Sequence, residues 1–106
     1  MDAEQHKKLA SQVKRKLNIT WDDQDTDARI ADMATNAVPT LAFKLGVNDT
    51  AFDWSDAGQE NLLIVNYCFY EWNHAANEFD AAYSDDIAQV RAKWEVKQFE
   101  EEVPNV

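Results

Sequence analysis

The strongest hydrophobic pattern in the chain lies between residues 61 and 79. Apolar residues recur there at spacings of three and four, as on one face of an α-helix: Leu62, Val65, Phe69, Trp72, Ala76 and Phe79. A second apolar set fills most of the remaining circumference over the first three turns: Leu63, Ile64, Tyr67, Cys68 and Tyr70. A helix that is apolar nearly all round must be covered on several sides. Residues 61–79 are therefore predicted to be the central helix of a small bundle.

Two further helices are predicted before this segment, at residues 3–17 and 26–45. Their buried positions are Leu9, Val13 and Leu17 in the first, and Ile30, Met33, Ala34, Ala37, Val38 and Leu41 in the second. Pro39 removes a backbone donor, so a kink or a break is expected there. Gly46 is predicted to end the second helix, because glycine adopts the left-handed conformation of a helix C-terminus without strain.

A last helix is predicted at residues 86–102. It has two apolar stripes, one of Ile87, Val90 and Trp94 and a second of Ala92, Val96 and Phe99. Residues 100–106 are expected to form a flexible tail. The predicted fold is thus all-α: a single domain over residues 1–106, built as a bundle of about four helices around the central one.

The longest predicted loop, residues 46–58, precedes the central helix. Phe52 and Trp54 are large apolar side chains in polar company. They either fold back onto the bundle or are offered to a partner, and the pattern leaves both alternatives open. Ser55 or Asp53 is predicted to cap the central helix, because their side-chain oxygens accept from free backbone N–H groups.

The polar connection at residues 18–27 contains Ile19 and Trp21, which are predicted to pack under the bundle. Its aspartates favour the N-terminus of the following helix, where the dipole attracts negative charge. Three of them match the first ligand positions of an EF-hand calcium loop: Asp23, Asp25 and Asp27. However, Ala28 and Ala34 stand where that loop requires glycine and a bidentate glutamate. The sequence therefore predicts helix capping rather than calcium binding.

No catalytic or cofactor motif stands out, and we expect no enzyme activity, no cofactor and no metal. Glu71 and His74 form a single Glu-x-x-His pair, whereas di-iron bundles use two such pairs. Cys68 is the only cysteine and lies in the most apolar stretch, which predicts a buried free thiol. His74 lies on the opposite side of a regular helix from Cys68, so the two do not form a nucleophile and base.

The net charge of −10 is spread unevenly. Residues 1–19 carry five basic and two acidic side chains, whereas the remaining 87 residues carry five basic and 18 acidic ones. So acidic a body repels a phosphate backbone, which argues against tight nucleic-acid binding except through the first helix. The basic cluster there is typical of a solvated face, with a nucleic-acid patch as the alternative. We expect no membrane span and, since no apolar leader is present, a protein used inside a cell.

The order of these features resembles the head–tail connector proteins of tailed bacteriophages, also called adaptor or head-completion proteins. A short basic helix ends in Leu17-x-Ile19, and an acidic stretch follows. An alanine-rich helix closed by Gly46 comes next, and then a loop that ends in Asp53-Trp54-Ser55 and runs directly into the next helix. A long apolar helix and a final helix complete the pattern. The resemblance covers nearly the whole chain, from Lys7 to Phe99.

This resemblance implies a structural role at the head–tail junction of a virion, after synthesis in the host cytoplasm. Family members form a ring that binds the portal protein and the downstream connector or stopper protein, and that lines the DNA channel. A monomer in solution is compatible with this role, because such rings can form only on a portal template. By analogy, the candidate contact residues are Phe52, Trp54, Phe99, Val103 and Val106. The alternative is a small acidic protein-binding module or a DNA-mimic inhibitor in a bacterial cell.

Overall fold

The computed structural model describes residues 1–102, with side chains as far as Glu100, and these residues form an all-α bundle without a strand. This confirms the predicted fold class. The elements in chain order are α1 (Ala3–Lys16), α2 (Gln24–Leu45), α3 (Gln59–Trp72), the short 3-10 helix η1 (Ala76–Glu78), α4 (Phe79–Ala82) and α5 (Ser84–Glu102).

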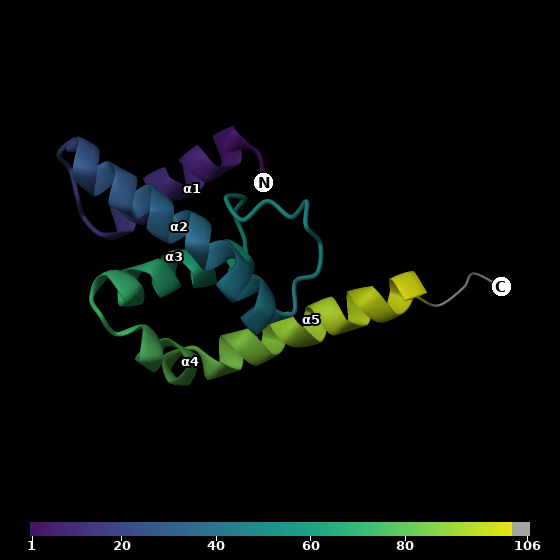
Figure 1. Cartoon of the computed structure of the whole chain (residues 1–106). Helices are drawn as coiled ribbons and strands as arrows, with labels where there is room; N and C mark the ends of the chain where they lie inside the picture. Colours follow the sequence, from purple (N-terminus) through teal and green to yellow (C-terminus); the bar gives the residue numbers. More distant parts are fainter. Residues whose placement is uncertain (103–106) are drawn as a thin grey trace.

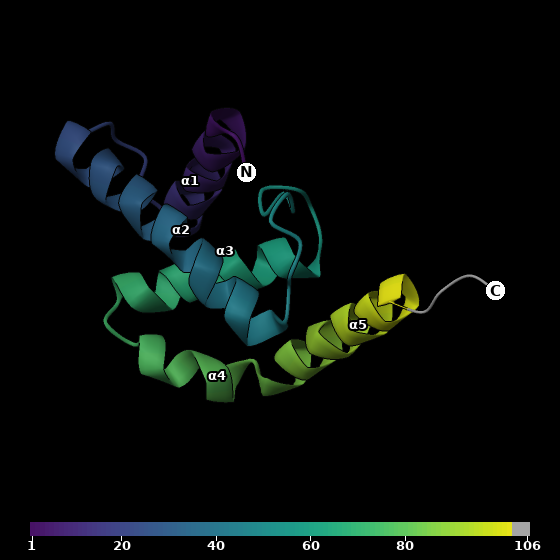
Figure 2. The same ribbon diagram turned by 45° about the vertical axis from the view of Figure 1, so that its right-hand side comes forward.

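The helix α3 lies at the centre and contacts α1, α2 and α5 (Figure 1). Both views place α1 and α5 at opposite ends of the molecule, with α2 and α3 between them (Figure 2). The described chain is elongated, 56 Å along its longest axis and 18 Å along its shortest. The core is drawn from every long helix and from the loop before α3; its largest fully buried apolar side chains are Phe79, Leu9, Ile30, Leu41, Leu45, Leu63, Ile64, Val13 and Val90.

The second helix has the predicted signals at both ends. Asp23 is its N-cap and accepts a hydrogen bond from the Thr26 backbone N–H at 3.0 Å, which confirms the capping role of the acidic run. Gly46 ends the helix with φ of 69°. The helix is continuous through Pro39, so the proline does not break it. Pro39 is exposed, and its ring therefore meets solvent rather than a neighbouring helix.

The central helix is shorter than predicted, because it ends at Trp72 and not at residue 79. His74 adopts a left-handed conformation with φ of 58°, and the N–H of Ala75 donates to the carbonyl of Tyr70 at 2.8 Å. This is a helix-terminating turn. The chain reverses there and carries Phe79, in α4, back against the rings of Tyr67 and Tyr70. The apolar spacing in the sequence continues beyond Trp72, although the helix itself ends there.

The buried face of α3 also differs from the predicted stripe. Leu63, Ile64 and Cys68 are fully buried, whereas Leu62 is 51% exposed and Phe69 is 38% exposed. Both faces of the segment are apolar in sequence, so the spacing alone could not identify which one meets the bundle. The structure turns the second apolar set inward.

The connection between α1 and α2 places its two apolar residues differently. Ile19 is buried, as predicted, but Trp21 is 58% exposed, so its predicted packing under the bundle is wrong. Asn18 is left-handed, with φ of 59°, and directs the chain outward to the cap at Asp23.

Two adjacent leucines test which face of α3 is structural. Leu63→Ala removes a fully buried side chain and is expected to lower the free energy of unfolding by about 2–5 kcal/mol. Leu62→Ala, the matched control, should change it by no more than about 1 kcal/mol, because Leu62 is half exposed. Urea denaturation followed by circular dichroism measures both. Equal losses for the two variants would contradict this orientation of α3.

Candidate assembly surface

The last helix extends beyond the bundle (Figure 1), and it carries exposed apolar side chains on its outer side. On its inner side Val90 and Trp94 are buried, whereas Val96 is 58% exposed and Phe99 is 67% exposed. At 100° per residue, the stripe of Ala92, Val96 and Phe99 lies on the side of the helix opposite Val90 and Trp94. The bundle covers the side of α5 that carries Val90 and Trp94. The opposite side is also apolar, and it stays exposed in a single copy of the chain.

A buried carboxylate fixes α5 to α3. Glu60 is 6% exposed, and its Oε2 accepts from Lys93 Nζ at 2.6 Å and from Trp94 Nε1 at 3.2 Å. Burial alone raises the pKa of a carboxyl group, but here the hydrogen bonds from Lys93 and Trp94 outweigh burial and hold the pKa of Glu60 below its usual value. The ionised carboxylate therefore links the first turn of α3 to the middle of α5.

Two further contacts set the direction of α5. Arg91 Nη1 donates to the carbonyls of Phe43 at 3.2 Å and Lys44 at 2.8 Å. These carbonyls lie in the last turn of α2, where backbone donors become scarce; the carbonyl of Phe43 also accepts from the N–H of Gly46 at 3.4 Å. The ring of Trp94 also packs edge to face against Phe52, with centroids 5.3 Å apart. The helix is thus held as far as Trp94, and its outer half continues in the same direction.

The predicted contact residues of the long loop point into the molecule. Trp54 is 2% exposed, and Phe52 is partly buried against it with ring centroids 5.2 Å apart. The structure thus realises the packing alternative for both side chains in the free chain. Their role as assembly contacts stays a prediction. Phe99 is exposed on the outer stripe, whereas Val103 and Val106 lie outside the described residues.

A partly buried polar network holds this loop against α1 and α3. Asn61 Nδ2 donates to Gln12 Oε1 at 2.7 Å and to the carbonyl of Trp54 at 2.8 Å. Gln12 Nε2 donates in turn to the carbonyl of Ser55 at 2.8 Å. The sequence pattern gave no sign of this network, because Gln12 and Asn61 are 49 residues apart.

The predicted cap of the central helix by Ser55 or Asp53 is wrong. The helix α3 begins at Gln59, after Gly58, without a side-chain cap. Instead, the Ser55 N–H and hydroxyl donate to Asp53 Oδ1, at 2.9 and 2.5 Å. These bonds hold the pKa of Asp53 below its usual value and close a local turn within the loop.

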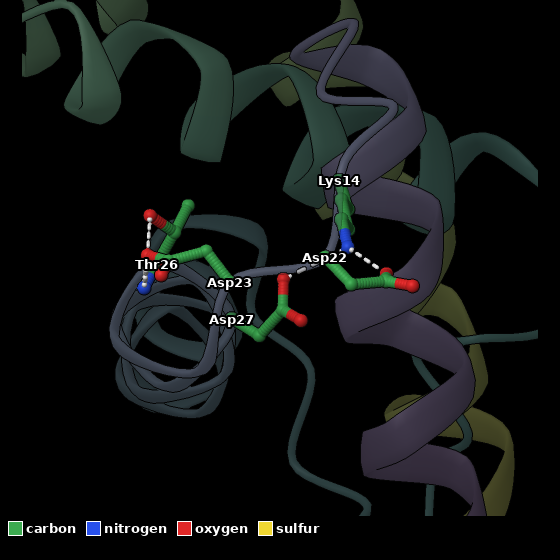
Figure 3. A network of polar contacts seen from close by, with 5 residues as sticks. All are labelled: Lys14, Asp22, Asp23, Thr26 and Asp27. Carbon is green, nitrogen blue, oxygen red and sulfur yellow. Dashed lines mark hydrogen bonds and ion pairs between the residues drawn. The ribbon is translucent and has the colours of Figure 1, made fainter.

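The outer face of α1 is basic. Figure 3 shows Lys14 between Asp22 and Asp27, with Nζ to Oδ1 distances of 2.9 and 2.8 Å. The hydrogen bonds to Asp27 and Asp22 raise the pKa of Lys14. Lys7 and Arg15 lie exposed on the same outer face, and neither makes an ion pair with any side chain among residues 1–100. Lys14 is therefore neutralised within the chain, whereas Lys7 and Arg15 can still pair with acidic groups of another molecule.

Sequence reasoning missed one large exposed side chain. Phe43 is 82% exposed near the end of α2. Its position, two residues from both Leu41 and Leu45, puts it on the far side of the helix from the buried stripe. The spacing could have identified it. Phe69 on α3 is partly covered by Lys16, whose Nζ lies 5.6 Å from the ring centroid.

The polar residues considered for metal or catalytic chemistry have other roles in the structure. Asp23 caps α2 and Asp27 pairs with Lys14. Cys68 is a buried free thiol, as predicted, and burial raises its pKa to about 12. Among the described residues no three His, Cys, Asp or Glu side chains are grouped as a metal site would require. No helix within residues 1–102 is both long and apolar enough to cross a membrane.

Comparisons of the chain with protein-family models, with curated proteins and with solved structures each gave no match. The connector resemblance therefore rests on the order of features in the sequence, and it stays a prediction.

Glu60→Gln tests the attachment of α5. Loss of the carboxylate is expected to lower the free energy of unfolding at pH 7 by about 1–3 kcal/mol, because a buried charge-assisted hydrogen bond is weakened. Since the folded pKa of Glu60 lies below its ordinary value of 4.5, its stabilising effect is present above that pH and is lost as the pH falls through the folded pKa. The difference between wild type and variant should therefore shrink in acid.

The matched control is Glu95→Gln, an exposed glutamate on α5, which should change stability by no more than about 0.5 kcal/mol. Urea denaturation from pH 3 to pH 7 gives both values. A loss for Glu60→Gln that stays constant across this range would contradict an ionised Glu60 in the folded state.

Proposed function

We propose that this protein is a structural head–tail connector of a tailed bacteriophage or prophage, without catalytic activity. In this role the chain joins a ring that binds the portal protein on one side and the next connector or stopper protein on the other. It acts at the head–tail junction of the virion.

The observation that carries the proposal is the outward apolar stripe on α5. Val96 and Phe99 are exposed on a helix that extends beyond the bundle, and its inner half is fixed by buried contacts. An exposed apolar stripe on a rigid projection is typical of a surface that another protein covers. The described residues thus offer an edge to which another protein can bind, and this supports an assembly role.

The distribution of charge favours a connector over a DNA mimic. A mimic needs carboxylates spaced regularly over one face. Here the basic α1 lies beside the acidic run, and Lys14 neutralises two of its aspartates. The acidic surplus is instead compatible with a channel lining, because negative charge repels the DNA that passes.

Negative-stain imaging of the protein mixed with portal rings from the same genome tests this proposal. We expect an additional ring of density on the portal. Val96→Asp/Phe99→Asp should abolish that density, because it places two charges in an apolar contact. Both residues are exposed, so circular dichroism should remain that of the wild type.

Leu62→Asp is the matched control, since it adds a charge at an exposed leucine on another helix, and it should leave the additional density in place. The connector proposal fails if the wild type leaves the portal bare at high protein concentration. If the protein then displaces DNA from a host DNA-binding protein, the acidic-mimic function takes its place.

A further inference from the structure

The first and last helices of this chain carry opposite charge excesses. The sequence of α1 (Ala3–Lys16) carries five basic side chains and one acidic one, whereas that of α5 (Ser84–Glu102) carries six acidic and three basic ones. The two helices lie at opposite ends of the molecule, with α2 and α3 between them (Figure 2). Neither can neutralise the other within one copy.

The outward stripe of α5 is bordered by acidic side chains. Glu95 and Glu100 are exposed, and at 100° per residue they lie on either side of Val96 and Phe99. The surface that covers this stripe must therefore combine positive charge with aliphatic or aromatic contact.

Pairing of α5 with α5 of another copy does not meet that requirement. An antiparallel pair brings the acidic first turn, with Asp85 and Asp86, against the acidic end at Glu100. A parallel pair places each glutamate opposite itself. Like charges in contact oppose both arrangements.

The outer face of α1 does combine positive charge with aliphatic contact. Lys7, Ser11 and Arg15 recur every four residues on that face, and all three are exposed. Lysine and arginine stems cover apolar surface with methylene groups while their charged ends reach the surrounding carboxylates. An arginine or lysine can also lie over an aromatic ring such as Phe99.

We infer that the outer stripe and acidic border of α5 in one copy pack on the basic outer face of α1 in the next copy, with Phe99 among the stems of Lys7 and Arg15. The contact is heterologous, head to tail. Repetition of such a contact closes a ring or extends a filament, according to the rotation between copies. This inference rests on the proposed function and names the partner of the α5 surface.

Two charge-reversal variants test the contact. Lys7→Glu/Arg15→Glu makes α1 more acidic, and Glu95→Lys/Glu100→Lys makes the border of α5 basic. Each variant alone then has like charges on both sides of the contact, and its self-association should be weaker by roughly tenfold or more. An equimolar mixture restores opposite charges at every contact, and it should associate within about threefold of the wild type. Sedimentation equilibrium at about 0.15 M salt measures all four samples.

Net charge alone gives the opposite expectation for one of these variants. Glu95→Lys/Glu100→Lys lowers the magnitude of the net charge from −10 to −6, which by itself should strengthen association. The matched control Asp32→Lys/Glu78→Lys makes the same net change at exposed sites away from α1 and α5. It should associate at least as well as the wild type.

The inference is overturned if the wild type stays monomeric up to about 1 mM, if the mixture fails to recover, or if the control loses association equally. These results are independent of the portal experiment. If the protein binds the portal but the charge-reversal variants do not change its self-association, the contact between α5 and α1 is wrong and the connector function stands. Charge-swap association without portal binding keeps the contact and removes that function.

Discussion

The whole fold depends on covering α3 from several directions at once. Its apolar side chains occupy most of the circumference, so a single neighbouring helix could not bury them all. The helices α1, α2 and α5 each cover one side. Leu63 and Ile64 reach full burial between them, at about 1.5–3 kcal/mol of favourable transfer free energy for each side chain. The other helices take their places around this requirement.

The polar contacts refine that arrangement rather than drive it. Glu60, Asn61 and Gln12 lie in places where burial without partners would be costly, and each has partners supplied by a different element. The Glu60 carboxylate must be paired, and its partners Lys93 and Trp94 lie on α5. This requirement restricts the position of α5 more than an apolar contact would. The outer half of the helix therefore takes its direction from residues near its middle.

Much of the fold could be predicted because its signals are local. The end of α2 followed from Gly46 and its start, predicted at residue 26 and observed at Gln24, from an aspartate run; the helical character of every long segment followed from spacing. The face of α3 could not be predicted, since Leu62 and Leu63 belong to two stripes of similar hydrophobicity. Its early end could not be predicted either, because the left-handed turn at His74 has no glycine to signal it.

The candidate surface was predicted in part, for the same reason. Phe99 belonged to a second stripe on a helix whose first stripe was already sufficient for packing, and that surplus was visible in the sequence. Phe52 and Trp54 were ambiguous, because a loop gives no period from which to infer a direction. Phe52 packs against Trp94, which lies far away in the sequence, and Trp54 packs in turn against Phe52.

The basic helix α1 and the predominantly acidic helix α5 lie on opposite sides of a subunit that carries a large net negative charge, so the electrostatic potential over its surface is uneven. At separations well beyond the Debye length, about 8 Å in physiological salt, neither property acts strongly. Within that range the net charge repels a second copy in most orientations, and the repulsion is weakest where the basic side chains of α1 face that copy. Orientation is therefore selected during the encounter, before any apolar side chain is buried.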